Sequence, residues 1–292
     1  MNWLEKLREG AHVHGSILCM GMDPVLEKMP EKLRKVGAEK AIVKFYLGIL
    51  EGIKGEDVWP SIVKPNIAYY ERYGFEGLRA LKKLIIAYQK AGLSVILDAK
   101  RGDIGRSSRA YAHNIFEFWG ADATTLPPYM GSDSIAPFIS YSKAGKGNYI
   151  LNRTSNPGAK EIQNLKVEVE DKKTMPLYLF VSQKIVEIGG DNKGVGAVVG
   201  ATSLEELKKI ASFYLNSDLE IPLLIPGVGA QGGSAKEVTE VLKKVGYPLE
   251  LVRINSSSGI NYAYLKYKEK PEAWVDAALD AIKALNREIR YG

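Results

Sequence analysis

Cysteine is nearly absent from this 292-residue chain, in which Cys19 is the only one. A lone cysteine excludes a disulfide framework and a structural zinc cluster, and it is typical of a reducing cytoplasm. The sequence also lacks any apolar run approaching the ~18 residues of a membrane span, and no secretory hydrophobic segment follows its charged N-terminal stretch. We therefore expect a cytoplasmic protein without a membrane partner.

Blocks of charge of one sign are also missing, although the chain is basic overall. Forty Lys and Arg residues against thirty-four Asp and Glu residues give a net charge of +6 and a pI near 9.0. Because the two signs are interspersed, a small anionic substrate explains the excess as well as a nucleic acid does. Sixteen tyrosines are scattered without the interleaved basic residues of a nucleic-acid surface, so we expect no nucleic-acid partner.

Histidine is scarce too, with three residues in the chain. His12 and His14 form an H-x-H pair, but no third ligand with compatible spacing accompanies them, so we expect no metal site. Cys19 lies inside an apolar stretch, which favours a buried inert thiol over a nucleophile.

The chain does contain a repeated alternation of short apolar runs and amphipathic stretches. The short runs are rich in Val, Ile and Leu, as in parallel strands buried on both faces. We predict strands over Ser16–Asp23, Trp59–Asn66, Leu93–Lys100, Ala121–Pro128, Asn148–Ser155, Val195–Thr202, Pro222–Val228 and Leu249–Ser256. Helices are predicted over Glu39–Gly55, Phe75–Ala91, Ser108–Trp119, Pro176–Ile188, Leu204–Leu215, Ser234–Val245 and Pro271–Asn286.

Eight strand–helix units in an undivided chain favour a single α/β domain over residues 1–292, folded as a (β/α)8 TIM barrel. A doubly wound open sheet is the alternative that periodicity alone does not exclude. A polar loop at about residues 156–175, with Ala159–Thr174 at its centre, is long for a βα connection. It is expected to be either a lid over the site or a solvated surface insertion.

The densest chemistry lies at the end of the third predicted strand. Strand alternation places Asp98 and Lys100 on one face, and Asp103 follows in a glycine-containing loop. Acids on both sides favour the protonated form of the lysine. Such a lysine can stabilise a developing carbanion and donate a proton to it. The alternative is a salt-bridged barrel rim without a catalytic role.

Two more charged residues end the neighbouring strands. Lys64 ends the second strand, where it should pair with Asp98, and Asp23 ends the first. Charges in apolar surroundings need partners, and these three residues can supply them to one another.

A glycine-rich stretch follows the seventh predicted strand. Gly227, Gly229 and Gly232 match G-x-G-x-x-G, the signature of a dinucleotide site. Its late position and the lack of an acid at the end of the next strand favour a phosphate site instead. The backbone N–H groups of Gly232 and Gly233, at a helix start, are the expected donors to a monophosphate.

Together these motifs resemble the orotidine 5′-phosphate decarboxylases, in their longer type 2 subfamily. The likeness covers nearly the whole chain and rests on Lys64-Pro-Asn, Asp98-Ala-Lys-Arg-Gly-Asp-Ile-Gly, Pro128-Tyr-Met-Gly, Thr154-Ser-Asn-Pro-Gly and Pro226-Gly-Val-Gly-Ala-Gln-Gly-Gly. The resemblance implies a cofactor-free decarboxylation of orotidine monophosphate to uridine monophosphate in pyrimidine biosynthesis.

The resemblance also implies roles for individual residues. Lys100 is the proton donor to the ring carbon, Asp98 lies against the substrate carboxylate, and Lys64 links that aspartate to the ribose. Asp103 reaches into the partner's site across a homodimer interface, and Ser107 crosses with it. The active sites are thus expected to be shared between subunits.

Substrate-binding roles follow from the same likeness. Asp23 is expected to bind the ribose, Ser155 the pyrimidine edge and Gln231 the phosphate side. One departure concerns Ser258, which stands where the family usually has a phosphate-binding arginine. Ser257 and Ser258 are the expected substitutes, or the position leaves a gap, or a cation such as Arg253 has taken over.

Two alternatives to this function stay open at this point. A metal-dependent sugar-phosphate decarboxylase of the same superfamily uses the same third-strand element. A non-catalytic nucleotide-binding relative is the other, because the phosphate-binding arginine is missing.

Overall fold

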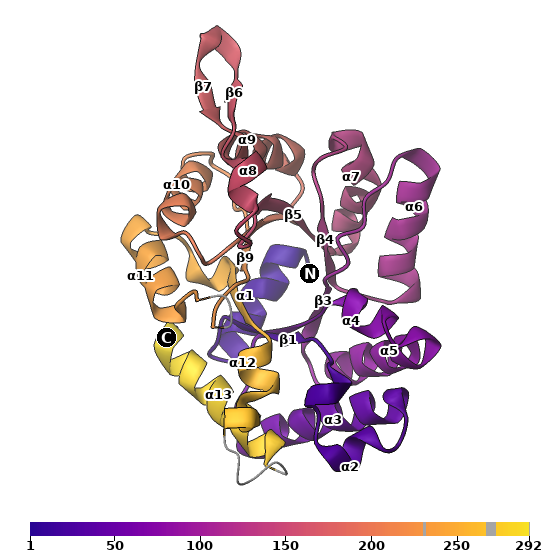
Figure 1. Ribbon diagram of the computed structural model, residues 1–292. Coiled ribbons are helices and arrows are strands. Elements are labelled where there is room, and N and C mark those ends of the chain that lie inside the picture. Colours follow the sequence, from indigo (N-terminus) through magenta and orange to yellow (C-terminus); the bar gives the residue numbers. More distant parts are fainter. Residues whose placement is uncertain (230–231, 267–272, 292) are drawn as a thin grey trace.

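Eight parallel strands close into a barrel in the computed structural model, which describes residues 1–229, 232–266 and 273–291 (Figure 1). The order around the barrel is β1-β10-β9-β8-β5-β4-β3-β2. These strands are β1 (Leu18–Met22), β2 (Ile62–Pro65), β3 (Ser94–Leu97), β4 (Ala123–Leu126), β5 (Gly147–Arg153), β8 (Val195–Val199), β9 (Leu223–Ile225) and β10 (Val252–Ser256). The predicted barrel is confirmed, and the open sheet is wrong because β1 pairs with both β2 and β10.

Helices surround the barrel on its outside (Figure 1). They are α1 (Trp3–Val13), α2 (Glu31–Arg34), α3 (Ala38–Glu56), α4 (Ile67–Glu71), α5 (Gly74–Lys90), α6 (Gly105–His113), α7 (Ser132–Ile139), α8 (Ala159–Gln163), α9 (Leu177–Gly189), α10 (Leu204–Leu215), α11 (Ala235–Val245), α12 (Ser258–Asn261) and α13 (Trp274–Ile289). The helix predicted over Ser108–Trp119 is α6 followed by a π-helical turn, Asn114–Phe118. Among the described residues, no helix combines the length and apolarity that crossing a membrane requires.

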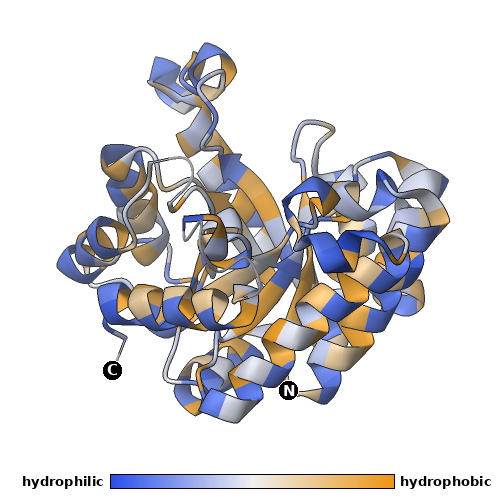
Figure 2. Cartoon of the chain, turned by 60° about the horizontal axis from the view of Figure 1, so that its bottom comes forward, coloured by the Kyte–Doolittle hydropathy of each residue, from blue (hydrophilic) through white to orange (hydrophobic). Residues whose placement is uncertain are grey.

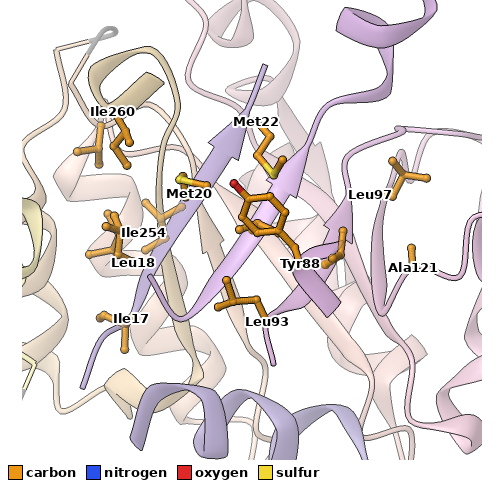
Figure 3. Close-up of a cluster of buried hydrophobic side chains, with 14 of the residues drawn as sticks. Ile17, Leu18, Met20, Met22, Tyr88, Leu93, Leu97, Ala121, Ile254 and Ile260 are labelled. Carbon is orange, nitrogen blue, oxygen red and sulfur yellow. The ribbon is translucent and has the colours of Figure 1, made fainter. Parts of the chain in front are cut away.

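The main core lies between the strands and the helices. The side chains of Leu18, Met20 and Met22 on β1 point outward into it, together with Tyr88 of α5 (Figure 3). Figure 2 shows strands that are largely hydrophobic beside helices in which hydrophobic and hydrophilic residues alternate. The helices thus turn one face to the barrel and the other to water.

A second, smaller core fills the interior of the barrel. Helix α1, which the sequence analysis did not single out, lies across one end of the barrel (Figure 1). Its Trp3, Leu4 and Leu7 pack against inward-facing strand residues such as Cys19 and Tyr149. Because Trp3 touches Gly147 at the start of β5, α1 closes the amino-terminal end. The opposite end, where the strands terminate, stays available for a site.

The long polar loop after β5 contains more structure than predicted. Helix α8 is followed by an antiparallel hairpin of β6 (Lys166–Glu168) and β7 (Thr174–Pro176), which projects away from the barrel (Figure 1). The alternating sequence Lys166-Val-Glu-Val-Glu favours such a strand. In this structure the segment is a surface insertion, and its use as a lid stays a prediction.

Candidate active site

A cavity of about 470 Å³ lies at the carboxyl ends of the barrel strands. Residues from the ends of all eight barrel strands meet there, although they are far apart in the sequence. The predicted site residues that line the cavity are Asp23, Lys64, Asp98, Lys100, Ser155, Ser257 and Ser258. The sequence analysis therefore found most of the charged and hydroxyl groups of this cavity.

Strand alternation explains why charge gathers on the cavity floor. Ile62 of β2 and Ile96 of β3 point into the barrel. Two residues further on, Lys64 and Asp98 occupy the next inward position on each strand. In the parallel register of β2 and β3, Asp98 is opposite Asn66, so Lys64 lies two residues before that position and within side-chain reach of Asp98.

Asp98 is held between two ammonium groups. Its Oδ2 lies 2.9 Å from Nζ of Lys64, and its Oδ1 lies 2.6 Å from Nζ of Lys100. Burial alone raises the pKa of Asp98, but the two lysines hold that pKa well below its usual range. Burial likewise lowers the pKa of Lys64, but the carboxylates of Asp98 and Asp23 raise it above its ordinary value. Asp98 and Lys64 are therefore both charged at neutral pH.

Lys100 reaches this chain through an unusual backbone conformation, because β3 ends at Leu97. Its φ angle of 47° lies in the left-handed region, which costs a residue with a side chain about 1–3 kcal/mol. Thr125, at the end of β4, stabilises the arrangement. Its hydroxyl donates to Asp98 Oδ1 at 2.8 Å and accepts the backbone N–H of Lys100 at 3.1 Å. The sequence analysis missed Thr125, whose only signal was its place at a strand end.

Asp23 lies at the inward end of β1 beside the same charges. Burial raises the pKa of its carboxyl group, although Lys64 and Ser257 oppose that rise. Its Oδ1 is buried and has no hydrogen-bond partner in the described structure. A Cβ on Gly21 would lie 1.8 Å from Ser257 Oγ, so this glycine makes room for the serine beside Asp23.

A side-chain network fixes the loop that carries Ser155. Gln163, the last residue of α8, accepts the backbone N–H of Thr154 at 2.9 Å and donates to the Thr154 hydroxyl at 2.8 Å. Arg153 donates to Gln163 Oε1 at 3.1 Å and pairs with Glu206 of α10 at 2.7 Å. Gln163 is thus a positioning residue that the sequence analysis missed, at the base of the β6–β7 hairpin.

We expect Gln163→Leu to loosen this loop, because the Thr154 N–H and hydroxyl then lose their partner. The Michaelis constant for the nucleotide should rise about three- to thirtyfold, as for a lost hydrogen bond or two, with a smaller fall in turnover. Gln183→Leu, at a half-buried site on α9, is the matched control. Equal kinetics for the two variants would contradict the positioning role.

The glycine loop after β9 differs from the prediction in its hydrogen bonds. The backbone N–H of Gly232 donates to the carbonyl of Gly229, and that of Gly233 donates to the carbonyl of Gly227. Both amides are therefore already bonded within the loop, which corrects the expectation of two free phosphate donors. Gly227 and Val228 line the cavity instead. Gln231, predicted on the phosphate side, lies outside the described residues.

Arg253 is remote from the cavity mouth. It faces the barrel interior, but its guanidinium is buried at the end that α1 closes. It donates there to the carbonyls of Leu7, Glu250 and Val252. Burial lowers the pKa of its guanidinium, and Tyr149 opposes this fall more than any other group does. The interpretation of Arg253 as a replacement phosphate ligand is therefore wrong.

We expect Arg253→Met to reduce stability without changing nucleotide affinity. A carbonyl left without its donor costs about 1–3 kcal/mol of folding free energy. Urea unfolding with parallel titration of uridine monophosphate tests this. A weakened affinity at unchanged stability would be the opposite of the expected result.

Asp103 and Ser107 stand apart from the other site residues. Neither lines the cavity, and in the described structure no ion pair joins Asp103 to Lys100. The Asp103 carboxylate accepts the backbone N–H of Ile104 at 2.8 Å, and Ser107 is exposed on α6. Within one chain, Lys100 is therefore paired with Asp98 and not placed between two acids.

The lone cysteine is as inert as the sequence predicted. Cys19 is fully buried, and burial raises the pKa of its thiol to about 12, so it is unreactive at neutral pH. In the described part of the chain, no three His, Cys, Asp or Glu side chains gather so that they could hold a metal ion.

Known proteins are similar to this chain in sequence and in fold. Residues 54–247 match the model of the orotidine 5′-phosphate decarboxylase / HUMPS family. The chain is 40% identical over 261 residues to orotidine 5′-phosphate decarboxylase of Herpetosiphon aurantiacus, covering 89% of this chain and 90% of that protein. The structure of Leishmania donovani OMP decarboxylase is similar with a TM-score of 0.73 and 31% identity, over 98% of this chain and 99% of that one. UMP synthase of the same organism matches with a TM-score of 0.73 and 32% identity, over 98% of this chain but 57% of that longer one. The chain therefore belongs to the orotidine 5′-phosphate decarboxylase / HUMPS family.

Proposed function

We propose that this protein decarboxylates orotidine 5′-monophosphate to uridine 5′-monophosphate, a step of pyrimidine biosynthesis, as a type 2 member of the family. The observation that carries the proposal is the Lys64–Asp98–Lys100 chain at the floor of a nucleotide-sized cavity. It occurs in a chain 40% identical to a protein named orotidine 5′-phosphate decarboxylase.

Lys100 is the proposed proton donor. When the bond between the ring carbon and the carboxylate breaks, carbon dioxide leaves and an electron pair remains on that carbon. An ammonium group facing the carbon stabilises the developing negative charge and then transfers a proton to it. The neutral amine regains its proton from water. The mechanism requires no cofactor, because the lysine supplies both the charge and the proton.

Asp98 has two tasks in this mechanism. Its bond to Lys100 holds the ammonium group in a fixed place. Its charge also faces the substrate carboxylate, so departure of carbon dioxide relieves a repulsion between like charges. Lys64 neutralises the far side of Asp98 and reaches toward the ribose.

The remaining cavity residues are proposed to orient the nucleotide. The unpartnered Asp23 Oδ1 suits a ribose hydroxyl, which can donate a hydrogen bond to it. Ser155 faces the pyrimidine edge. The phosphate side is formed by Ser257 and Ser258 together with the loop that contains Gln231, Gly232 and Gly233. Because the amides of Gly232 and Gly233 are already bonded within that loop, the serine hydroxyls are the proposed donors.

We also propose a cytoplasmic homodimer with shared active sites. Asp103 and Ser107 lie outside their own cavity, at the start of α6, where a partner can meet them. Two apolar side chains flank that region in solvent, with Ile104 60% exposed and Tyr129 96% exposed. A partner that covers these two side chains removes their apolar surface from water. The lone cysteine agrees with a reducing compartment.

An ultraviolet assay with orotidine monophosphate, run with and without a chelator, tests the proposed function. We expect conversion to uridine monophosphate at equal rates in both samples. Activity that disappears with the chelator would support a metal-dependent relative. Tight binding of uridine monophosphate without turnover would support a non-catalytic nucleotide-binding protein.

A further inference from the structure

The cavity contains few positive charges that are free to bind a phosphate. Of the described residues that line it, Lys28, Lys64 and Lys100 are cationic. Lys64 and Lys100 both contact the Asp98 carboxylate, at 2.9 Å and 2.6 Å. Lys28 makes no ion pair with any residue that the structure describes, so its charge is available to a ligand.

Lys28 also lies on the appropriate side of the mouth. It ends the turn η1 (Leu26–Lys28), which follows β1, whereas Ser257 and Ser258 follow β10. Strands β9, β10 and β1 are consecutive around the barrel. The Lys28 ammonium lies 5.7 Å from the ring centroid of Tyr262, which directly follows α12. The lysine therefore lies next to the sector where the loops after β9 and β10 meet.

The backbone beneath Lys28 is held by three tyrosine hydroxyls. The Tyr262 hydroxyl accepts the N–H of Val25 at 2.6 Å and donates to the carbonyl of Asp23 at 3.0 Å. The Tyr73 hydroxyl accepts the N–H of Leu26 at 2.9 Å, and the Tyr264 hydroxyl donates to the carbonyl of Lys28. A fixed backbone with a free ammonium group is well suited to meet an incoming anion.

From these contacts we propose that Lys28 is the phosphate-binding cation of this chain, in place of the arginine that Ser258 replaces. The inference rests on the proposed function and names the group that recognises the phosphate monoester of the substrate. The other candidates are weaker because Arg253 is buried at the opposite end, and the Gly232 and Gly233 amides are bonded within their loop. A charged donor adds more to phosphate binding than neutral hydroxyls do.

The test compares binding of uridine monophosphate and uridine to wild type and to Lys28→Met by calorimetry. We expect the variant to lose about tenfold in affinity for the monophosphate and nothing for the nucleoside. The affinity of the monophosphate should also depend less on salt in the variant. Lys35→Met is the matched control, since Lys35 is exposed on the neighbouring turn and pairs with Glu31.

A second variant distinguishes loss of the charge from a disturbance of η1 by the methionine at position 28. Ser258→Arg in the Lys28→Met background should restore affinity for the monophosphate. Equal losses for nucleotide and nucleoside, or no restoration in a double variant that binds uridine normally, would refute the role of Lys28. If the wild type converts orotidine monophosphate but Lys28→Met binds uridine monophosphate with wild-type affinity, the role of Lys28 is refuted and the proposed function stands. Wild-type protein that neither binds nor converts these nucleotides would remove both proposals.

Discussion

Lys100→Ala should abolish turnover of orotidine monophosphate while leaving the fold intact. The side chain of Lys100 is 47% exposed, and Lys64 still neutralises Asp98 in its absence, so little folding free energy is lost. The variant loses both the proton donor and the charge that stabilises the carbanion. Together these effects amount to at least about a 10⁴-fold loss in turnover.

Turnover measured beside a thermal unfolding curve tests this expectation. Lys6→Ala is the control, because Lys6 pairs with Asp122 at 3.5 Å at the opposite end of the barrel. That variant should keep wild-type turnover. A Lys100→Ala variant that folds and keeps turnover within about tenfold of wild type would mean that the proton comes from elsewhere.

Mixing two inactive variants should restore activity. If Asp103 acts in the partner's site, Lys100→Ala and Asp103→Ala subunits form mixed dimers in which one site carries both defects and the other carries neither. Random exchange in equal amounts makes about half of the dimers mixed, so about a quarter of all sites become intact. Activity should therefore rise from almost nothing to about a quarter of the wild-type value.

The mixing experiment needs proof that subunits exchange, for example from mass spectrometry of differently labelled chains. Each variant incubated alone provides the baseline. No return of activity despite demonstrated exchange would show that Asp103 does not complete the partner's site, and the shared-site proposal would be wrong.

The barrel could be predicted from the sequence because its strands are short, apolar and regularly spaced. The same regularity predicted that Lys64 and Asp98 pair, since both occupy the inward position at the ends of neighbouring strands. Long-range pairing in a parallel barrel depends on strand order, and strand order follows from the repeat itself.

Other parts of the site depend on conformation that periodicity does not encode. Strand alternation predicted that Asp98 and Lys100 lie on the same side, and they do. The strand ends before Lys100, however, and the contact depends on its positive φ angle and on the Thr125 hydroxyl. The bonded amides of Gly232 and Gly233 depend on the turn geometry of their loop. Gln163 gave no signal, because a glutamine in a polar stretch is ordinary until its partners are known.

Arg253 shows why a residue type alone does not identify a ligand. Its side chain points into the barrel, but its height along the barrel axis decides which groups it contacts. At the end that α1 closes, the guanidinium meets backbone carbonyls and no anion. Helix α1 was missed because it precedes the first strand and lies outside the strand–helix repeat. Its apolar residues close one end of the barrel and do not pack on the outside of the strands.

The most direct test is product analysis in D2O, which asks whether an exchangeable proton replaces the carboxylate of orotidine monophosphate, as a lysine donor requires. We expect one carbon dioxide and one uridine monophosphate per substrate, with deuterium at the ring carbon that carried the carboxylate, because the lysine protons exchange with solvent. Folded wild-type protein that binds the nucleotide yet forms neither product, or forms uridine monophosphate without deuterium at that carbon, would contradict this expectation.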